Sequence, residues 1–138
     1  MRKRTRAREF ALQVLYQIDL THDNYADALN SFWQAHDEDE VVTEIKDFTE
    51  ELVSGAVVNL SDIDDMISKY ATNWQLERMA VIDRNILRMG CFELLFCDDI
   101  PPKVSINEAV ELAKRYSGLE AGKFVNAILD KIKTEKGK

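Results

Sequence analysis

The chain has 138 residues, a length typical of one domain and sufficient to bury a hydrophobic core. Apolar residues make up 46% and charged residues 31% of it, which favours an ordinary globular protein over a disordered one. No apolar run reaches the roughly 18 residues of a membrane span, and no apolar region with a cleavage site follows the charged N-terminus. These features exclude a membrane protein and predict a cytoplasmic one.

The net charge of −7 argues at first against a nucleic-acid partner. The charge is unevenly distributed, however. The first 18 residues contain five bases and a single acid, Glu9, whereas residues 19–65 contain many acids and one base, Lys46. Because the Debye length is roughly 8 Å at physiological salt, a distant acidic face weakens a local basic one only slightly. A polyanionic partner at the N-terminus is therefore compatible with the acidic total.

The predicted elements are helices, because breakers are few and apolar residues recur at steps of three and four. Such stripes run through residues 7–18, 25–33, 45–57 and 63–70. Ser61 and Asp64 form a plausible capping pair for the fourth helix. The acidic run Asp37 to Glu40 lacks the ligand pattern of a calcium-binding loop and is predicted to be a solvated connection.

The second half is dominated by residues 79–96, which are apolar on almost every side and predict a central, covered helix. Ser105 and Glu108 are predicted to form a capping box that opens the next helix, and Gly118 to stop it. A last helix covers residues 124–132. The predicted fold is all-α, with about seven helices in a single domain over residues 1–138 and a soft division near 73–76.

Catalytic and metal-binding signals are weak throughout. Cys91 and Cys97 are six residues apart in an apolar stretch, which favours buried free thiols over a disulfide or a metal site. His22 and His36 have no partner at metal-ligand spacing, and no nucleotide-binding or hydrolase motif occurs. The sequence predicts no enzyme, no cofactor and no metal.

Two groups of residues are candidates for binding RNA. The first is the set of five N-terminal bases, whose guanidinium forks suit phosphate oxygens: Arg2, Lys3, Arg4, Arg6 and Arg8. A solvated, frayed tail explains them equally well. The second group is Tyr16 with Lys123 and Phe124, because aromatic rings stack on unpaired bases and a helix N-terminus favours phosphate. Core packing is the more ordinary role of both aromatics.

Four segments, in order, resemble the NusB family. They are the opening Arg4-x-Arg6-Ala7-Arg8-Glu9 with residues 11–16, the stretch 82–94 that begins Ile82-Asp83-Arg84-Asn85, and the segments 102–114 and 123–130. The resemblance extends from Arg4 to about Lys131. Thr5, Phe92 and Ala127 depart from the family pattern; Thr5 stands where another arginine is frequent, which thins the expected phosphate contacts.

The resemblance implies two small packed helical bundles and a bacterial cytoplasmic protein. It also implies binding to the boxA element of ribosomal RNA transcripts together with NusE, in support of read-through by RNA polymerase. Arg4, Arg6 and Arg8 with Tyr16, Lys123 and Phe124 would then line the RNA surface. Glu77 and Asp83 would face NusE, a basic partner, and the surface that NusE covers would also allow a homodimer.

Two rival interpretations follow from the same residues. Related helical domains occur attached to ribosomal RNA methyltransferases, but the chain ends soon after Asp130, which leaves no room for a cofactor-binding domain. A purely protein-binding helical adaptor, in which the arginines are incidental, survives better. It predicts that replacing Arg4, Arg6 and Arg8 with alanine leaves RNA retention unchanged.

Overall fold

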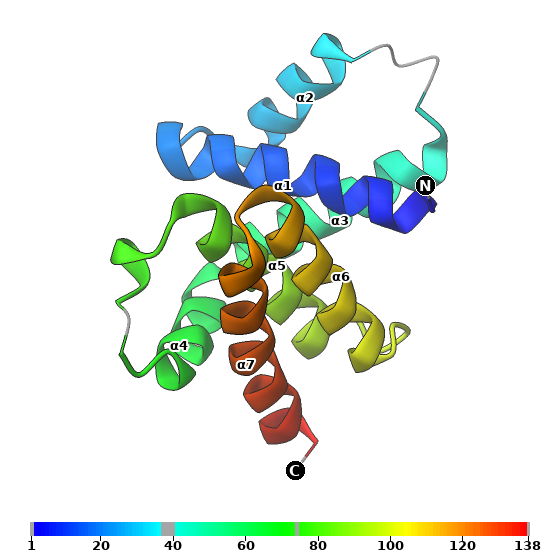
Figure 1. Cartoon of the computed structure of the whole chain (residues 1–138). Coiled ribbons are helices and arrows are strands. Elements are labelled where there is room, and N and C mark those ends of the chain that lie inside the picture. Colours follow the sequence, from blue (N-terminus) through cyan, green and yellow to red (C-terminus); the bar gives the residue numbers. More distant parts are fainter. Residues whose placement is uncertain (1, 37–40, 74, 138) are drawn as a thin grey trace. The chain divides into compact units, whose positions relative to one another are not determined.

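The computed structural model describes residues 2–36, 41–73 and 75–137, and within these ranges the regular structure is entirely helical (Figure 1). The predicted all-α class is confirmed. In chain order the elements are α1 (Lys3–Thr21), α2 (Tyr25–Ala35), α3 (Thr43–Val58), α4 (Leu60–Tyr70), the 3₁₀ helix η2 (Leu76–Arg78), α5 (Val81–Phe96), α6 (Pro102–Tyr116) and α7 (Leu119–Lys136). The acidic run at residues 37–40 lies outside the described residues. None of the described helices is both long enough and apolar enough to span a bilayer.

The chain divides into two compact units, Met1–Val58 and Asn59–Lys138. This division comes earlier than the soft boundary predicted near residues 73–76. The reason lies in α4, which packs against α5 and α7 and thereby joins the second unit. Asn73, Gln75 and Leu76 thus belong to the second unit.

In the first unit, α1 packs against α3 and α2 through buried apolar side chains, among them Phe10, Val14 and Leu52. The hydroxyl of Thr49 on α3 donates to the carbonyl of Ala7 at 3.3 Å, so that the two helices also meet through a polar contact. An aromatic cluster joins α1 to α2, with rings in edge-to-face or tilted contact: Phe10, Phe32, Trp33 and His36. His36 is half-buried in this cluster.

In the second unit, α5 is the central helix and contacts α4, α6 and α7, as its apolar composition predicted. Ile86, Leu87 and Cys91 on it are completely buried. Gly90 allows α7 to approach closely, because a Cβ atom at this position would lie 2.8 Å from Cδ1 of Leu129. This packing fixes the N-terminal part of α5, which carries Asp83. It also fixes the N-terminal part of α7, which carries Lys123 and Phe124.

The two predicted helix caps are wrong. The helix α4 begins at Leu60 after Asn59, and Asp64 accepts hydrogen bonds from Arg88 instead of pairing with Ser61. The helix α6 begins at Pro102, which a helix tolerates in its first turn. Ser105 consequently lies inside the helix, where its hydroxyl donates to the buried carboxylate of Glu93 at 2.9 Å. Gly118, with φ 131°, follows the end of α6 as expected.

Both cysteines are free and buried, as predicted. Burial raises the pKa of the Cys91 thiol to about 12, and the nearby carboxylate of Asp64 adds to the effect. The folded protein therefore holds this thiol in its protonated form well above the pH at which an unfolded cysteine ionises.

A pH dependence of stability follows from this thiol. Because the folded pKa is the higher one, its contribution is fully present below about pH 9 and is lost as the pH rises toward about 12. We expect the stability difference between the wild type and Cys91→Ala to shrink progressively above about pH 9. Urea unfolding of both proteins between pH 7 and 11 measures it; a difference that stays constant over this range would contradict the assignment.

Candidate nucleic-acid interface

Four of the five N-terminal bases are exposed at the start of α1, one on the N-cap residue and three in the first turn: Arg2, Lys3, Arg4 and Arg6. We call these four residues the basic end of α1. Arg8, which the sequence grouped with them, is only 2% exposed. The helix begins at Lys3, and Arg2 is its N-cap residue with an extended backbone. These four side chains form a surface able to contact phosphates, and Arg8 is buried beneath it.

Three arginines of α1 make cation–π contacts with aromatic rings. The guanidinium carbon of Arg4 lies 4.5 Å from the centroid of the Phe48 ring on α3, and that of Arg8 lies 5.3 Å from the same centroid. Arg6 lies 4.8 Å from the ring centroid of Phe10. Such cation–π contacts lower the conformational freedom of an arginine while leaving its N–H groups able to donate. The side chains are thus partly preorganised.

Acidic side chains of α3 lie beside the basic end of α1. Nζ of Lys3 lies 3.3 Å from Oε2 of Glu44. The same two helices enclose a small hollow of about 270 Å³, which is lined by Lys3, Arg4, Glu44, Asp47, Phe48 and Glu51. Sequence reasoning missed this acidic stripe. Its signal was the spacing of residues 44, 47, 48 and 51, which places them on one helical face.

Tyr16 is on the same helix, farther from its N-terminus, and is 39% exposed. It lies about 15 Å along the helix axis from Arg6, given a rise of roughly 1.5 Å per residue. The ring is therefore accessible and not a core side chain. Its position leaves it available for stacking on a base.

In the second unit, Lys123 is exposed and Phe124 is half-buried on the first turns of α7. Phe124 lines a groove that we call the α5–α7 groove, with an open volume of about 810 Å³. The groove is lined by Met79, Ala80, Asp83, Ser117, Gly118, Leu119, Glu120, Ala121 and Phe124. Leu119 is 71% exposed there. The groove thus contains Phe124, predicted to contact RNA, and Asp83, predicted to contact a protein.

The predicted partner-binding residues have different environments. Glu77 is exposed on η2. Asp83, in the first turn of α5, is half-buried, and its Oδ1 has no hydrogen-bond partner among the described residues. Because a buried carboxylate oxygen without a donor is unfavourable, this atom is suited to accept a hydrogen bond from a bound molecule.

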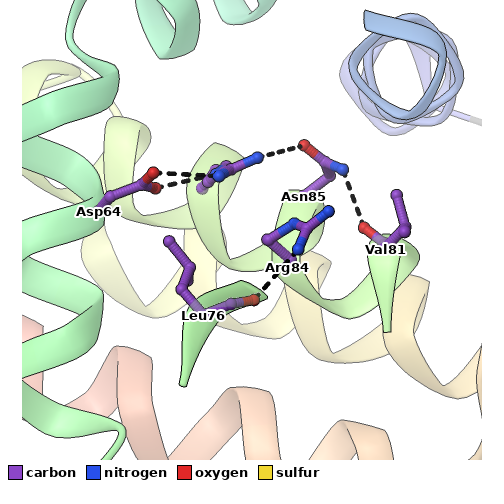
Figure 2. A network of polar contacts seen from close by, with 6 residues as sticks. Asp64, Leu76, Val81, Arg84 and Asn85 are labelled. Atoms are coloured by element: carbon purple, nitrogen blue, oxygen red, sulfur yellow. Dashed lines mark hydrogen bonds and ion pairs between the residues drawn. The ribbon is translucent and has the colours of Figure 1, made fainter. Parts of the chain in front are cut away.

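A polar network connects η2 and α4 to α5 (Figure 2). Nη1 of Arg84 donates to the carbonyl of Leu76 at 3.2 Å. Arg88 donates to both carboxylate oxygens of Asp64, at 2.9 and 3.0 Å. Asn85 continues the network to the carbonyl of Val81 at 2.8 Å. The bond from Arg84 ties η2, which carries Glu77, to α5.

Within the described residues, no group of three or more histidine, cysteine or acidic side chains is arranged to hold a metal ion. The fold and the exposed basic end define the class: an all-helical protein with the surface chemistry of a nucleic-acid-binding protein. The model of the NusB family matches residues 5–134, and the chain belongs to this family.

Relatives and solved structures agree with this membership. The chain is 48% identical over 130 residues to the transcription antitermination protein NusB of Anaeromyxobacter dehalogenans, covering 94% of this chain and 89% of the relative. It is 45% identical to that of Myxococcus xanthus, covering 96% and 95%. These relatives are transcription antitermination proteins, which confirms the prediction of a non-enzymatic protein.

Among solved structures, Thermotoga maritima NusB superposes with a TM-score of 0.85 at 42% identity, covering 96% of this chain and 91% of that one. A structure of NusB and NusE in complex with double-stranded RNA superposes with a TM-score of 0.87 at 31% identity, covering 98% of each chain. The helical architecture is therefore that of the family.

Proposed function

We propose that this chain is a transcription antitermination factor of the bacterial cytoplasm. It binds boxA-type RNA of ribosomal RNA transcripts together with NusE and supports read-through by RNA polymerase. Family membership and the NusB–NusE complex with RNA among the similar structures support this proposal. The observation that carries it is the basic end of α1, where four exposed bases lie on the N-cap residue and the first turn of the helix in a protein of net charge −7.

The proposed RNA contacts are made by both units, and each unit contributes its own residues. The basic end of α1 contacts phosphates, and the exposed ring of Tyr16 stacks on a base. Lys123 and Phe124 provide a further charge and a further ring; they lie in the second turn of α7, because the helix begins at Leu119 and not at Lys123 as the sequence had predicted. Arg8 acts from below this surface, since it is buried against Phe48.

Replacing Lys3, Arg4 and Arg6 together with alanine is expected to weaken binding of a boxA-like RNA at least about tenfold. If each of the four exposed bases neutralised a phosphate, log K against log salt would have a slope of about −3, from roughly 0.7 per phosphate on single strands, and this is the steepest slope expected for the wild type. Fluorescence anisotropy over a range of salt concentrations measures both quantities.

The matched control replaces three exposed lysines of the second unit, Lys103, Lys131 and Lys133, and removes the same charge. It should weaken binding far less than the first triple. Equal losses in both triples, or a wild-type slope near zero, would contradict a specific phosphate site on α1. They would leave the alternative of a helical protein adaptor without direct RNA binding.

The proposed NusE surface consists of Glu77 and Asp83. Glu77→Lys is expected to weaken NusE binding about tenfold, because an exposed carboxylate that faces a basic partner becomes a like charge. Isothermal titration calorimetry measures the affinity, with Glu111→Lys as a control on an exposed acid of the same unit. Equal effects of the two reversals would place the partner elsewhere.

Self-association through the surface that NusE covers is part of the proposal. The exposed Leu119 in the α5–α7 groove supports it, because a large exposed apolar side chain favours a protein contact. Analytical ultracentrifugation with and without NusE tests it. Dimers that persist unchanged when NusE is bound would show that the two surfaces differ.

A further inference from the structure

Acidic side chains of α3 lie beside the basic end of α1, where we expect phosphates to bind. On α3, Glu44, Asp47 and Glu51 are exposed, occupy one helical face and line the same hollow as Lys3 and Arg4. Glu44 forms an ion pair with Lys3, with Nζ and Oε2 3.3 Å apart. A phosphate oxygen that approaches Lys3 therefore meets an ammonium group that a carboxylate oxygen already contacts.

The position of these acids is fixed by the core of the first unit. Phe48, on the same face of α3, is buried and lies under the guanidinium groups of Arg4 and Arg8. Thr49 bonds to the carbonyl of Ala7 on α1. Because these contacts set the register of α3 against α1, they hold the acids next to the bases.

We propose that the carboxylates of Glu44 and Asp47, with that of Glu51, are specificity-determining residues for RNA: they compete with phosphates at the basic end of α1 and suppress binding to unrelated polyanions. This inference rests on the proposed RNA-binding function. Binding to unrelated RNA consists almost entirely of phosphate contacts, so the competition reduces it most. Binding to a preferred RNA also uses stacking, for instance on Tyr16, and is reduced less.

A second consequence concerns salt. When a phosphate displaces a carboxylate from a base, the freed carboxylate attracts cations from the solution. Fewer counterions are therefore released overall than when the base was unpaired. The wild-type protein should therefore show a shallower slope of log K against log salt than its number of exposed bases implies. Removing the carboxylates should make the slope steeper.

The test compares the double variant Glu44→Gln/Asp47→Asn with the control Asp23→Asn/Asp27→Asn. The control removes the same charge from exposed acids of the same unit, near the opposite end of α1. A labelled boxA-like RNA and a scrambled RNA of equal length and composition are titrated by fluorescence anisotropy at several salt concentrations. Circular dichroism verifies that both variants are folded.

We expect the first variant to bind scrambled RNA up to about fivefold more tightly than the wild type, from the usual strength of exposed ion pairs. Its affinity for the boxA-like RNA should rise less, so that discrimination falls, and its salt slope should steepen. The control should change neither the discrimination between the two RNAs nor the salt slope. If the wild type binds RNA and the two variants behave identically, the proposed competition is wrong and the RNA-binding function is unaffected. If neither the wild type nor Glu44→Gln/Asp47→Asn binds any RNA, the proposed function fails and the proposed competition with it.

Discussion

Phe48→Ala is expected to lower the free energy of unfolding by about 3–5 kcal/mol, the usual cost of removing a buried phenyl ring. Phe48 is 5% exposed and packs in the core that α1 and α3 share. Its ring also lies beneath two guanidinium groups, those of Arg4 and Arg8, which would lose their support. Urea denaturation followed by circular dichroism measures the loss.

The control is Phe48→Leu, which keeps most of the apolar volume but removes the aromatic face. It should cost less stability, while still weakening RNA binding in conditions where the protein is fully folded, because Arg4 loses its cation–π contact. RNA affinity that is unchanged in Phe48→Leu would contradict a positioning role for the ring. A stability loss below about 1 kcal/mol in Phe48→Ala would contradict its place in the core.

Arg88→Ala should destabilise the second unit by about 2–3 kcal/mol, somewhat less than the 3–5 kcal/mol typical of a fully buried pair. Arg88 donates to both carboxylate oxygens of Asp64, and the two side chains are 13% and 25% exposed. Removing Arg88 leaves the carboxylate of Asp64 without that partner in a partly desolvated position between α4 and α5. Thermal and urea unfolding measure the effect.

Arg88→Lys provides the matched comparison. A lysine keeps the charge but cannot reproduce the planar fork that donates to both oxygens, so it should recover only part of the loss. Full recovery by lysine would show that charge alone matters. A loss below about 0.5 kcal/mol in Arg88→Ala would show that the pair behaves like an exposed one.

The helices were predictable because their signal is periodic and local. Residues 79–96 are apolar on nearly every side, and the structure indeed surrounds α5 with α4, α6 and α7. The caps were not predictable, because the side chains that matched the capping pattern have stronger distant partners. Asp64 pairs with Arg88 and Ser105 with Glu93, contacts that bridge 24 and 12 residues of sequence.

The basic end of α1 was visible in the sequence as a cluster of charges. The burial of Arg8 was not, because it depends on Phe48, some forty residues away on another helix. The acidic stripe on α3 had a readable spacing, but its significance comes from packing beside Lys3 and Arg4. Tertiary contacts thus decide which of several similar charges are free to meet a ligand and which already meet each other.

The central claim is that the chain binds boxA-type RNA together with NusE, and anisotropy of a labelled boxA-like RNA tests it most directly. The RNA is titrated with the protein alone and with the protein plus saturating NusE, beside a scrambled RNA of the same composition. The account predicts that NusE tightens binding of the boxA-like RNA and leaves the scrambled RNA weakly bound. No binding of either RNA under both conditions would contradict it, and the protein would then be a helical adaptor.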